Sequence, residues 1–203
     1  MRLYIMFIGD FEKVATWSDD AVKGCKRFLD RVWNLADQVT EEKGVSEKNA
    51  PIVHKTIKKV TDDIDTLKMN TAIAALMSMV NEFYANGLSR GDLEALLLML
   101  SPFAPHMVEE LWEQKGFAAE HDGKMAMQCA WPEYDESKTV ASSVEMAVQV
   151  GGKLKGTVTV PVDSDQDTVV EAAKANEKVA KALAGMQIVK VIHVKNKLVN
   201  LIV

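Results

Sequence analysis

Apolar residues in the first half of the chain recur every three or four positions, the spacing of one face of an α-helix. The pattern predicts helices at about 19–39, 50–67 and 71–85, and two more within 93–112. The stretch from Leu93 to Leu100 is apolar nearly all round, which favours a place inside a bundle. Pro102 should end that helix at about Ser101, and Pro105 suits the first turn of the next. We therefore expect an antiparallel all-α five-helix bundle with short loops.

From Val144 the period of the apolar residues becomes two, which indicates a β-strand. Gly151-Gly152 predicts a hairpin turn into a second strand, which Pro161 stops. A helical segment in two short pieces is expected over 163–184, before a second pair of strands at 188–194 and 198–203. The order β-β-α-β-β defines a small α+β domain of about 60 residues, near the lower limit for a self-supporting core.

The predicted fold is therefore multi-domain. Residues 116–134 lose the helical period and are interpreted as an irregular wrap, with Trp131 docking on the bundle. The apolar run at 3–8 is expected to be a buried segment with no partner of its own. The expected organisation is an N-terminal segment (1–17), the helical bundle with its wrap (18–134), a linker (135–143) and the small α+β domain (144–203).

Charge is distributed unevenly along the 203 residues. The formal net charge is −5, which argues against a uniformly basic nucleic-acid-binding protein. Residues 144–203 hold eight basic and six acidic side chains, a net of +2, and the rest of the chain is acidic. Two cysteines, and no apolar run of the length of a membrane span, favour a cytoplasmic protein without a membrane partner. Contacts with phosphate must therefore come from local clusters of basic residues.

The sequence contains no catalytic constellation. The motifs GxSxG, GxGxxG and the Walker loop are absent. His106 and Glu110 lie four residues apart on one helix, but no third ligand follows at a matching spacing. We therefore predict no catalytic and no metal-binding residues, and no cofactor bound by this chain.

Basic residues on predicted surfaces are the candidates for RNA contact. They are Lys23, Arg27 and Arg31 on the first helix, Lys55, Lys58 and Lys59 on the second, and Lys153, Lys155, Lys195 and Lys197 at the two hairpin turns. Asp62 and Asp63 follow Lys58 and Lys59 by four residues, so part of that charge should be paired along the helix. The four turn lysines form one basic end if both turns lie at the same end of the sheet. An ordinary solvated surface is the alternative interpretation of both helical clusters.

Several segments together resemble one family. PFAPHMVEELW at 102–112 resembles a motif in the helical tRNA-binding domain of class I aminoacyl-tRNA synthetases for leucine, valine, isoleucine and methionine. HKTIKKVT at 54–61, LKMNTAIAALM at 67–77, and WSD at 17–19 leading into RFL at 27–29 resemble the bacterial-type leucyl-tRNA synthetases. VQVGGKLKG at 148–156 resembles the small domain appended to the leucine enzymes. The resemblance covers essentially the whole chain.

This resemblance implies a tRNA-binding C-terminal portion of an enzyme that joins leucine to tRNA(Leu) using ATP and Mg²⁺. The family's catalytic domain, with its HIGH and KMSKS motifs, and its editing domain would precede Met1, so residues 1–17 would belong to the connection. The bundle would dock the stem side of the tRNA, the small domain its outer corner, and this portion alone would be inactive. The alternative is a free-standing helical module that binds other proteins and has no tRNA role.

Overall fold

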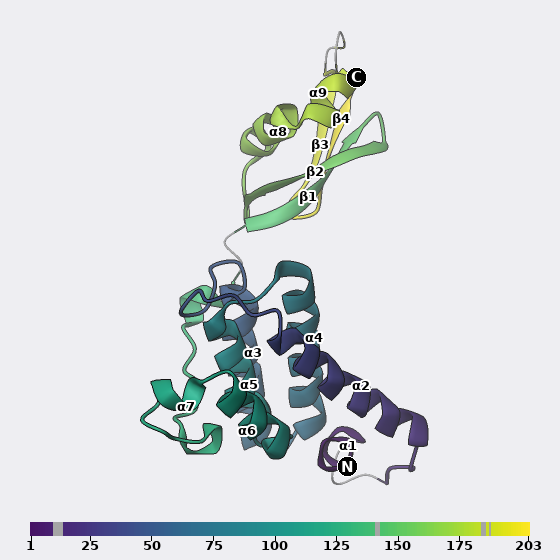
Figure 1. Ribbon diagram of the computed structural model, residues 1–203. Helices are drawn as coiled ribbons and strands as arrows, with labels where there is room; N and C mark the ends of the chain where they lie inside the picture. Colours follow the sequence, from purple (N-terminus) through teal and green to yellow (C-terminus); the bar gives the residue numbers. More distant parts are fainter. Residues whose placement is uncertain (10–13, 141–142, 184–185, 187) are drawn as a thin grey trace. The chain divides into compact units, whose positions relative to one another are not determined.

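The computed structural model describes residues 1–9, 14–140, 143–183, 186 and 188–203. The chain forms two compact units, at 1–140 and 141–203 (Figure 1). The predicted segment 1–17 and linker 135–143 extend over residues 10–13 and 141–142, which lie outside the described residues. Coarsely, the prediction of a helical part followed by a part with a small sheet is correct.

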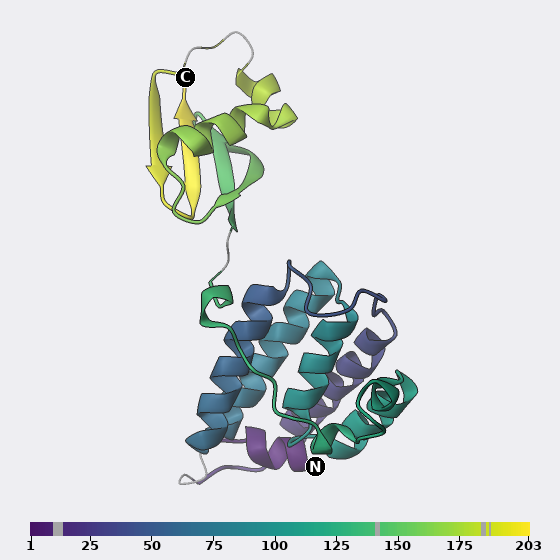
Figure 2. The ribbon, with the colours of Figure 1, turned by 90° about the vertical axis from the view of Figure 1, so that its left-hand side faces the viewer.

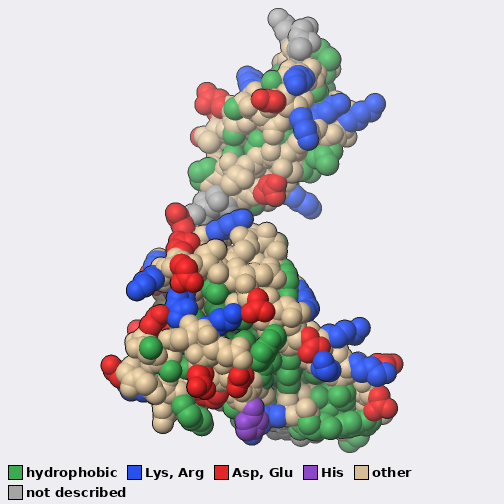
Figure 3. Space-filling model, in the orientation of Figure 1, with side chains coloured by type: hydrophobic (Ala, Val, Ile, Leu, Met, Phe, Trp, Pro, Cys, Tyr) green, Lys and Arg blue, Asp and Glu red, His purple; other side chains and the backbone are tan. Residues whose placement is uncertain are grey.

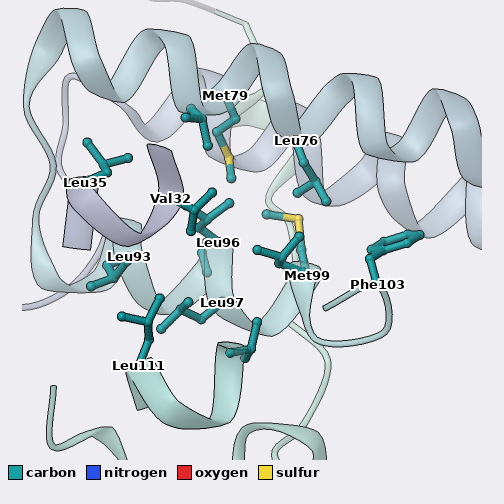
Figure 4. Close-up of a cluster of buried hydrophobic side chains, with 14 of the residues drawn as sticks. Val32, Leu35, Leu76, Met79, Leu93, Leu96, Leu97, Met99, Phe103 and Leu111 are labelled. Atoms are coloured by element: carbon teal, nitrogen blue, oxygen red, sulfur yellow. The ribbon is translucent and has the colours of Figure 1, made fainter. Parts of the chain in front are cut away.

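The first unit is helical. Its elements are α1 (Arg2–Phe7), α2 (Asp19–Ala36), α3 (Ala50–Asp65), α4 (Met69–Asn86), α5 (Arg90–Leu100), α6 (Pro105–Gln114), α7 (Phe117–Glu120) and the 3₁₀ turns η1 (Ala126–Gln128) and η2 (Glu136–Lys138). α5 lies among the other helices, as its all-round apolar sequence predicts (Figure 2). Leu93, Leu96 and Leu97 of α5 are fully buried and face side chains from α2, α4 and α6 (Figure 4).

Local capping explains where several helices begin and end. The Ser18 hydroxyl accepts a hydrogen bond from the Ala21 N–H at the start of α2. Ser89 and Asp92 form a capping box at the start of α5. Gly87 ends α4 with a φ of 77°, which glycine adopts without strain.

The segment at the N-terminus has a partner, contrary to the sequence-based expectation. Residues 2–7 form α1, which packs against α2 and α4 and buries Leu3 and Tyr4. The Tyr4 hydroxyl accepts a 2.8 Å hydrogen bond from the Ser18 N–H, and its ring meets Trp17 edge to face. Six residues make fewer than two helical turns, which is too short to show a periodic pattern. The apolar run of α1 therefore did not indicate a helix.

A buried polar cluster holds the 40–49 loop against the start of α5. The Asp92 carboxylate accepts hydrogen bonds from Ser46 N (3.1 Å) and Oγ (2.6 Å), Asn49 Nδ2 (2.8 Å) and Ser89 N (2.9 Å). Ser89 Oγ also donates to the carbonyl oxygen of Gly44 at 2.7 Å. The loop therefore lies so close to α5 that only glycine fits at position 91.

The second unit is a four-stranded mixed sheet with helices on one face. Its elements are β1 (Ser143–Val150), β2 (Lys153–Pro161), α8 (Gln166–Ala175), α9 (Glu177–Leu183), β3 (Lys190–Val194) and β4 (Leu198–Ile202), and the strand order is β2-β1-β4-β3. β1 and β4 are parallel, and the other neighbours are antiparallel. Val148, Val199 and Leu201 on the sheet pack with Val169 and Ala173 of α8 to form the core.

Candidate nucleic-acid interface

Three of the predicted lysines, Lys55, Lys58 and Lys59, line a groove beside α3 and α4. We call it the lysine groove. Its volume is about 420 Å³, and it is lined by Ile52, Lys55, Thr56, Lys58, Lys59, Asp62, Ala75 and Ser78. Positions 55, 58 and 59 are three and four residues apart, so their side chains meet on one side of α3. The small side chains of Ala75 and Ser78 on α4 leave room for a ligand between the two helices. A groove lined by three lysines suits a chain of phosphates.

The lysines of the groove differ in their partners. Lys59 pairs with Asp63, a carboxylate only 4% exposed that also accepts from Thr71 Oγ1. Lys58 does not pair along the helix with Asp62, as the sequence predicts, but with Glu136 at 2.7 Å. Lys55 makes no ion pair with another described residue. Lys55 and Lys58 are therefore better placed than Lys59 to take up a phosphate.

The predicted basic residues of α2, Lys23, Arg27 and Arg31, are exposed, and acidic side chains lie among them (Figure 3). Lys23 lies 3.0 Å from Asp20, and the guanidinium of Arg31 lies 4.7 Å from the centre of the Tyr84 ring. Neither Arg27 nor Arg31 makes an ion pair among the described residues, but Arg31 lies over an aromatic ring and Arg27 does not. The charge available to a phosphate on α2 is therefore smaller than the sequence suggests.

The basic residues of the small unit lie at two ends of its sheet rather than one. Because β1 runs parallel to β4, the Gly151-Gly152 turn lies at the end where both strands finish. The turn with Lys195 and Lys197 precedes β4 and lies at the opposite end. Lys190, which pairs with Ile202, is the basic residue that shares an end with Lys153. The condition for a single basic end is not met, because the helical connection through α8 and α9 makes the inner strands parallel.

Residues 131–138 form a strap along α3, which continues the predicted wrap of 116–134 into the predicted linker. Trp131 Nε1 donates to Thr61 Oγ1 at 2.8 Å, which confirms the expected docking of this tryptophan. The Asp135 N–H donates to His54 Nδ1 at 3.1 Å, and Glu136 accepts from Lys58. The partners are 70 to 81 residues apart in the sequence, so no local pattern could pair them.

Strap docking should weaken in mild acid. Burial and the nearby Lys138 lower the pKa of His54, although Asp135 opposes the shift. The folded state therefore favours neutral His54, whose Nδ1 accepts from Asp135. Because the pKa of His54 is lower in the folded state, the stabilisation of the strap by neutral His54 is complete above the ordinary histidine pKa. It is lost as the pH falls through the pKa of His54 in the folded state. We expect tryptic cleavage after Lys138 to accelerate between about pH 7.5 and 5.5 relative to His54→Gln, whose rate should show no such step. Parallel profiles for both proteins would contradict this role of His54.

A second pocket, of about 460 Å³, lies between α3, α5 and the residues around 121–133. His121 Nε2 lies 2.8 Å from Glu94 Oε1 at its wall. Burial raises the pKa of the Cys129 thiol in the same pocket, so the sulfur is a poor nucleophile. Among the described residues, no group of three or more His, Cys, Asp or Glu could hold a metal ion. None of the described helices is long and apolar enough to cross a membrane.

Comparison with known proteins identifies the class. Residues 52–171 match the family described as the anticodon-binding domain of tRNA ligase. This chain belongs to that family, and the match runs from α3 into α8.

The particular relatives are leucine–tRNA ligases, in agreement with the resemblance found in the sequence. The chain is 45% identical over 204 residues to the leucine–tRNA ligase of Alkaliphilus oremlandii, covering 100% of this chain and 25% of that protein. It is 44% identical over 207 residues to that of Chlorobaculum tepidum, covering 98% and 25%. The agnB2 LeuRS of Agrobacterium radiobacter K84, solved as a ternary complex with tRNA and LeuAMS, is 27% identical, with a TM-score of 0.61 over 99% of this chain and 28% of that one. The chain thus spans about a quarter of the length of the curated relatives it matches.

Proposed function

We propose that this chain is the tRNA-docking portion of a leucine–tRNA ligase and that its partner is tRNA(Leu). The observation that carries the proposal is similarity to leucine–tRNA ligases over the whole chain, on a fold whose α3–α4 surface carries a lysine groove. Activation of leucine with ATP and Mg²⁺, and editing, would be the work of other domains of the whole enzyme. The proposed location is the cytoplasm, where tRNA is aminoacylated.

In this proposal the two units have different parts. Helices α2–α6 are the five-helix, anticodon-binding-type bundle of 18–134, and they hold the RNA backbone along the lysine groove and Arg27. The β-β-α-β-β domain of 144–203 contacts the RNA at one end of its sheet through Lys153 and Lys155, or at the other through Lys195 and Lys197. Backbone contacts of this kind position an RNA without reading its bases.

Neutralising two lysines of the groove tests the proposal. Lys55→Gln with Lys58→Gln should weaken binding of a tRNA(Leu) transcript roughly tenfold and lower the slope of log affinity against log salt by about one to two. Lys59 is left in place because Asp63 depends on it.

The matched control is Lys174→Gln with Lys178→Gln, which removes the same charge from exposed positions of α8 and α9. It should change affinity by less than about twofold. Equal losses in the two double variants would show that the effect is net charge and that the groove is not the contact site. Both sets can be compared by fluorescence anisotropy from about 50 to 200 mM salt.

A further inference from the structure

Lys58 contacts the strap and also lines the lysine groove. Its side chain lines the lysine groove, and its ammonium group holds both carboxylate oxygens of Glu136, at 2.7 and 2.8 Å. The Tyr134 ring lies 5.7 Å from the same nitrogen. An ammonium group engaged in this way must give up contacts with Glu136 to bind another anion fully.

The strap reaches Lys58 along a single stripe of α3. Its partners there are His54, Lys58 and Thr61, which are four and three residues apart and therefore lie one above another. Lys55 and Lys59 lie on the neighbouring stripe, inside the groove. Lys58 is thus the point where strap and groove meet.

The contact between Glu136 and Lys58 is suited to exchange. The two side chains are 65% and 39% exposed, so solvent screens their attraction and the ion pair is weak. The hydrogen bond with the Glu136 carboxylate raises the pKa of Lys58, so the ammonium is charged while the pair is formed. A polyanion that also contacts Lys55 brings several charges to the groove, whereas the strap brings the single carboxylate of Glu136 to Lys58.

We propose that Glu136 is an intramolecular competitor for Lys58, so that an RNA backbone entering the lysine groove displaces it and releases the η2 turn of the strap. The inference rests on the proposed function, because it takes RNA as the natural polyanion. The coupling is reciprocal. If the docked strap lowers the affinity for RNA by some factor, bound RNA lowers the equilibrium constant for strap docking by the same factor. The turn directly precedes the residues that lead to β1, so release lengthens the tether of the second unit.

Binding of tRNA by the whole chain tests the competition. Glu136→Gln should tighten binding about two- to fivefold, the range expected for an exposed ion pair. The gain should disappear when Lys58→Gln is already present. Glu133→Gln removes the same charge from an exposed strap residue that makes no ion pair among the described residues, and should give less than half that gain. An equal gain in the Lys58→Gln background, or from Glu133→Gln, would overturn the proposal.

Release of the strap is measured independently with heparin, a polyanion that needs no tRNA-specific contact. Heparin should accelerate tryptic cleavage after Lys138 in the unsubstituted protein, read by mass spectrometry and corrected with a peptide substrate. Glu136→Gln should be cleaved fast without heparin and gain little from it. If tRNA does not bind but heparin has this effect, the proposed function fails and the exchange stands. If heparin leaves the cleavage rate of the unsubstituted protein unchanged, the exchange is refuted.

Discussion

Replacing Asp92 by alanine is expected to lower the free energy of unfolding of the helical unit by about 3–5 kcal/mol. The carboxylate is fully buried and is the common acceptor for Ser46, Asn49 and Ser89. Alanine removes this acceptor from the buried Asn49 and Ser89 and from the partly buried Ser46, and each buried donor left unpaired costs about 1–3 kcal/mol. The substitution also removes half of the capping box of α5.

Urea unfolding followed by circular dichroism measures this effect, with Asp20→Ala as the control. Asp20 is also an aspartate in the first turn of a helix, but its side chain is 92% exposed. The control should change stability only within the small range typical of exposed positions. If Asp92→Ala unfolded at the same urea concentration as Asp20→Ala, the buried cluster would not hold the loop.

Gly91→Ala and Gly24→Ala should shift stability in opposite directions, although both glycines lie in helices. A Cβ at position 91 would lie 2.1 Å from the carbonyl carbon and 2.3 Å from the carbonyl oxygen of Gly44. Backbone cannot swing aside as a side chain can, so the 40–49 loop must move. We expect a loss of about 2–3 kcal/mol, the upper part of the range for overpacking.

A Cβ at position 24 meets only the end of the Arg27 side chain, at 4.0 Å. Gly24→Ala should therefore stabilise the protein by about 0.5–1 kcal/mol, the helix propensity of alanine over glycine. Thermal unfolding of the two variants, measured side by side, checks the sign of each. A Gly91→Ala protein as stable as the parent would contradict the close approach of the loop to α5.

Local pattern was sufficient where a structure depends on neighbours in the sequence. The spacing of apolar residues located α2 to α6, because the buried stripe of a helix involves residues within a turn or two of each other. α1 was missed since its six residues are too few for a period. The choice of parallel strand pairs depends on how the helical connection crosses the sheet. Because β1 and β4 are parallel, Lys195 lies at the opposite end of the sheet from Lys153.

The candidate interface was predictable only as a set of exposed charges. Periodicity put Lys55, Lys58 and Lys59 on one helix, but the partners of these lysines are fixed by tertiary structure. Glu136 comes from a segment 78 residues away and took the place of the expected partner, Asp62. The groove itself exists because α4 presents Ala75 and Ser78 to α3, a juxtaposition of helices that side-chain periodicity does not encode.

The most direct test of the central claim is photocrosslinking from inside the lysine groove. A photoreactive benzoylphenylalanine at position 55 should crosslink to tRNA(Leu), and excess unlabelled tRNA(Leu) or high salt should abolish the product. The same group at position 113 serves as the control, because Glu113 is exposed on α6, which packs against α5, α7 and η1. A crosslink from position 55 that is absent from position 113 is the predicted result. Bound tRNA that crosslinks equally from both positions, or only from position 113, would contradict the claim that α3 and α4 form the tRNA-docking surface.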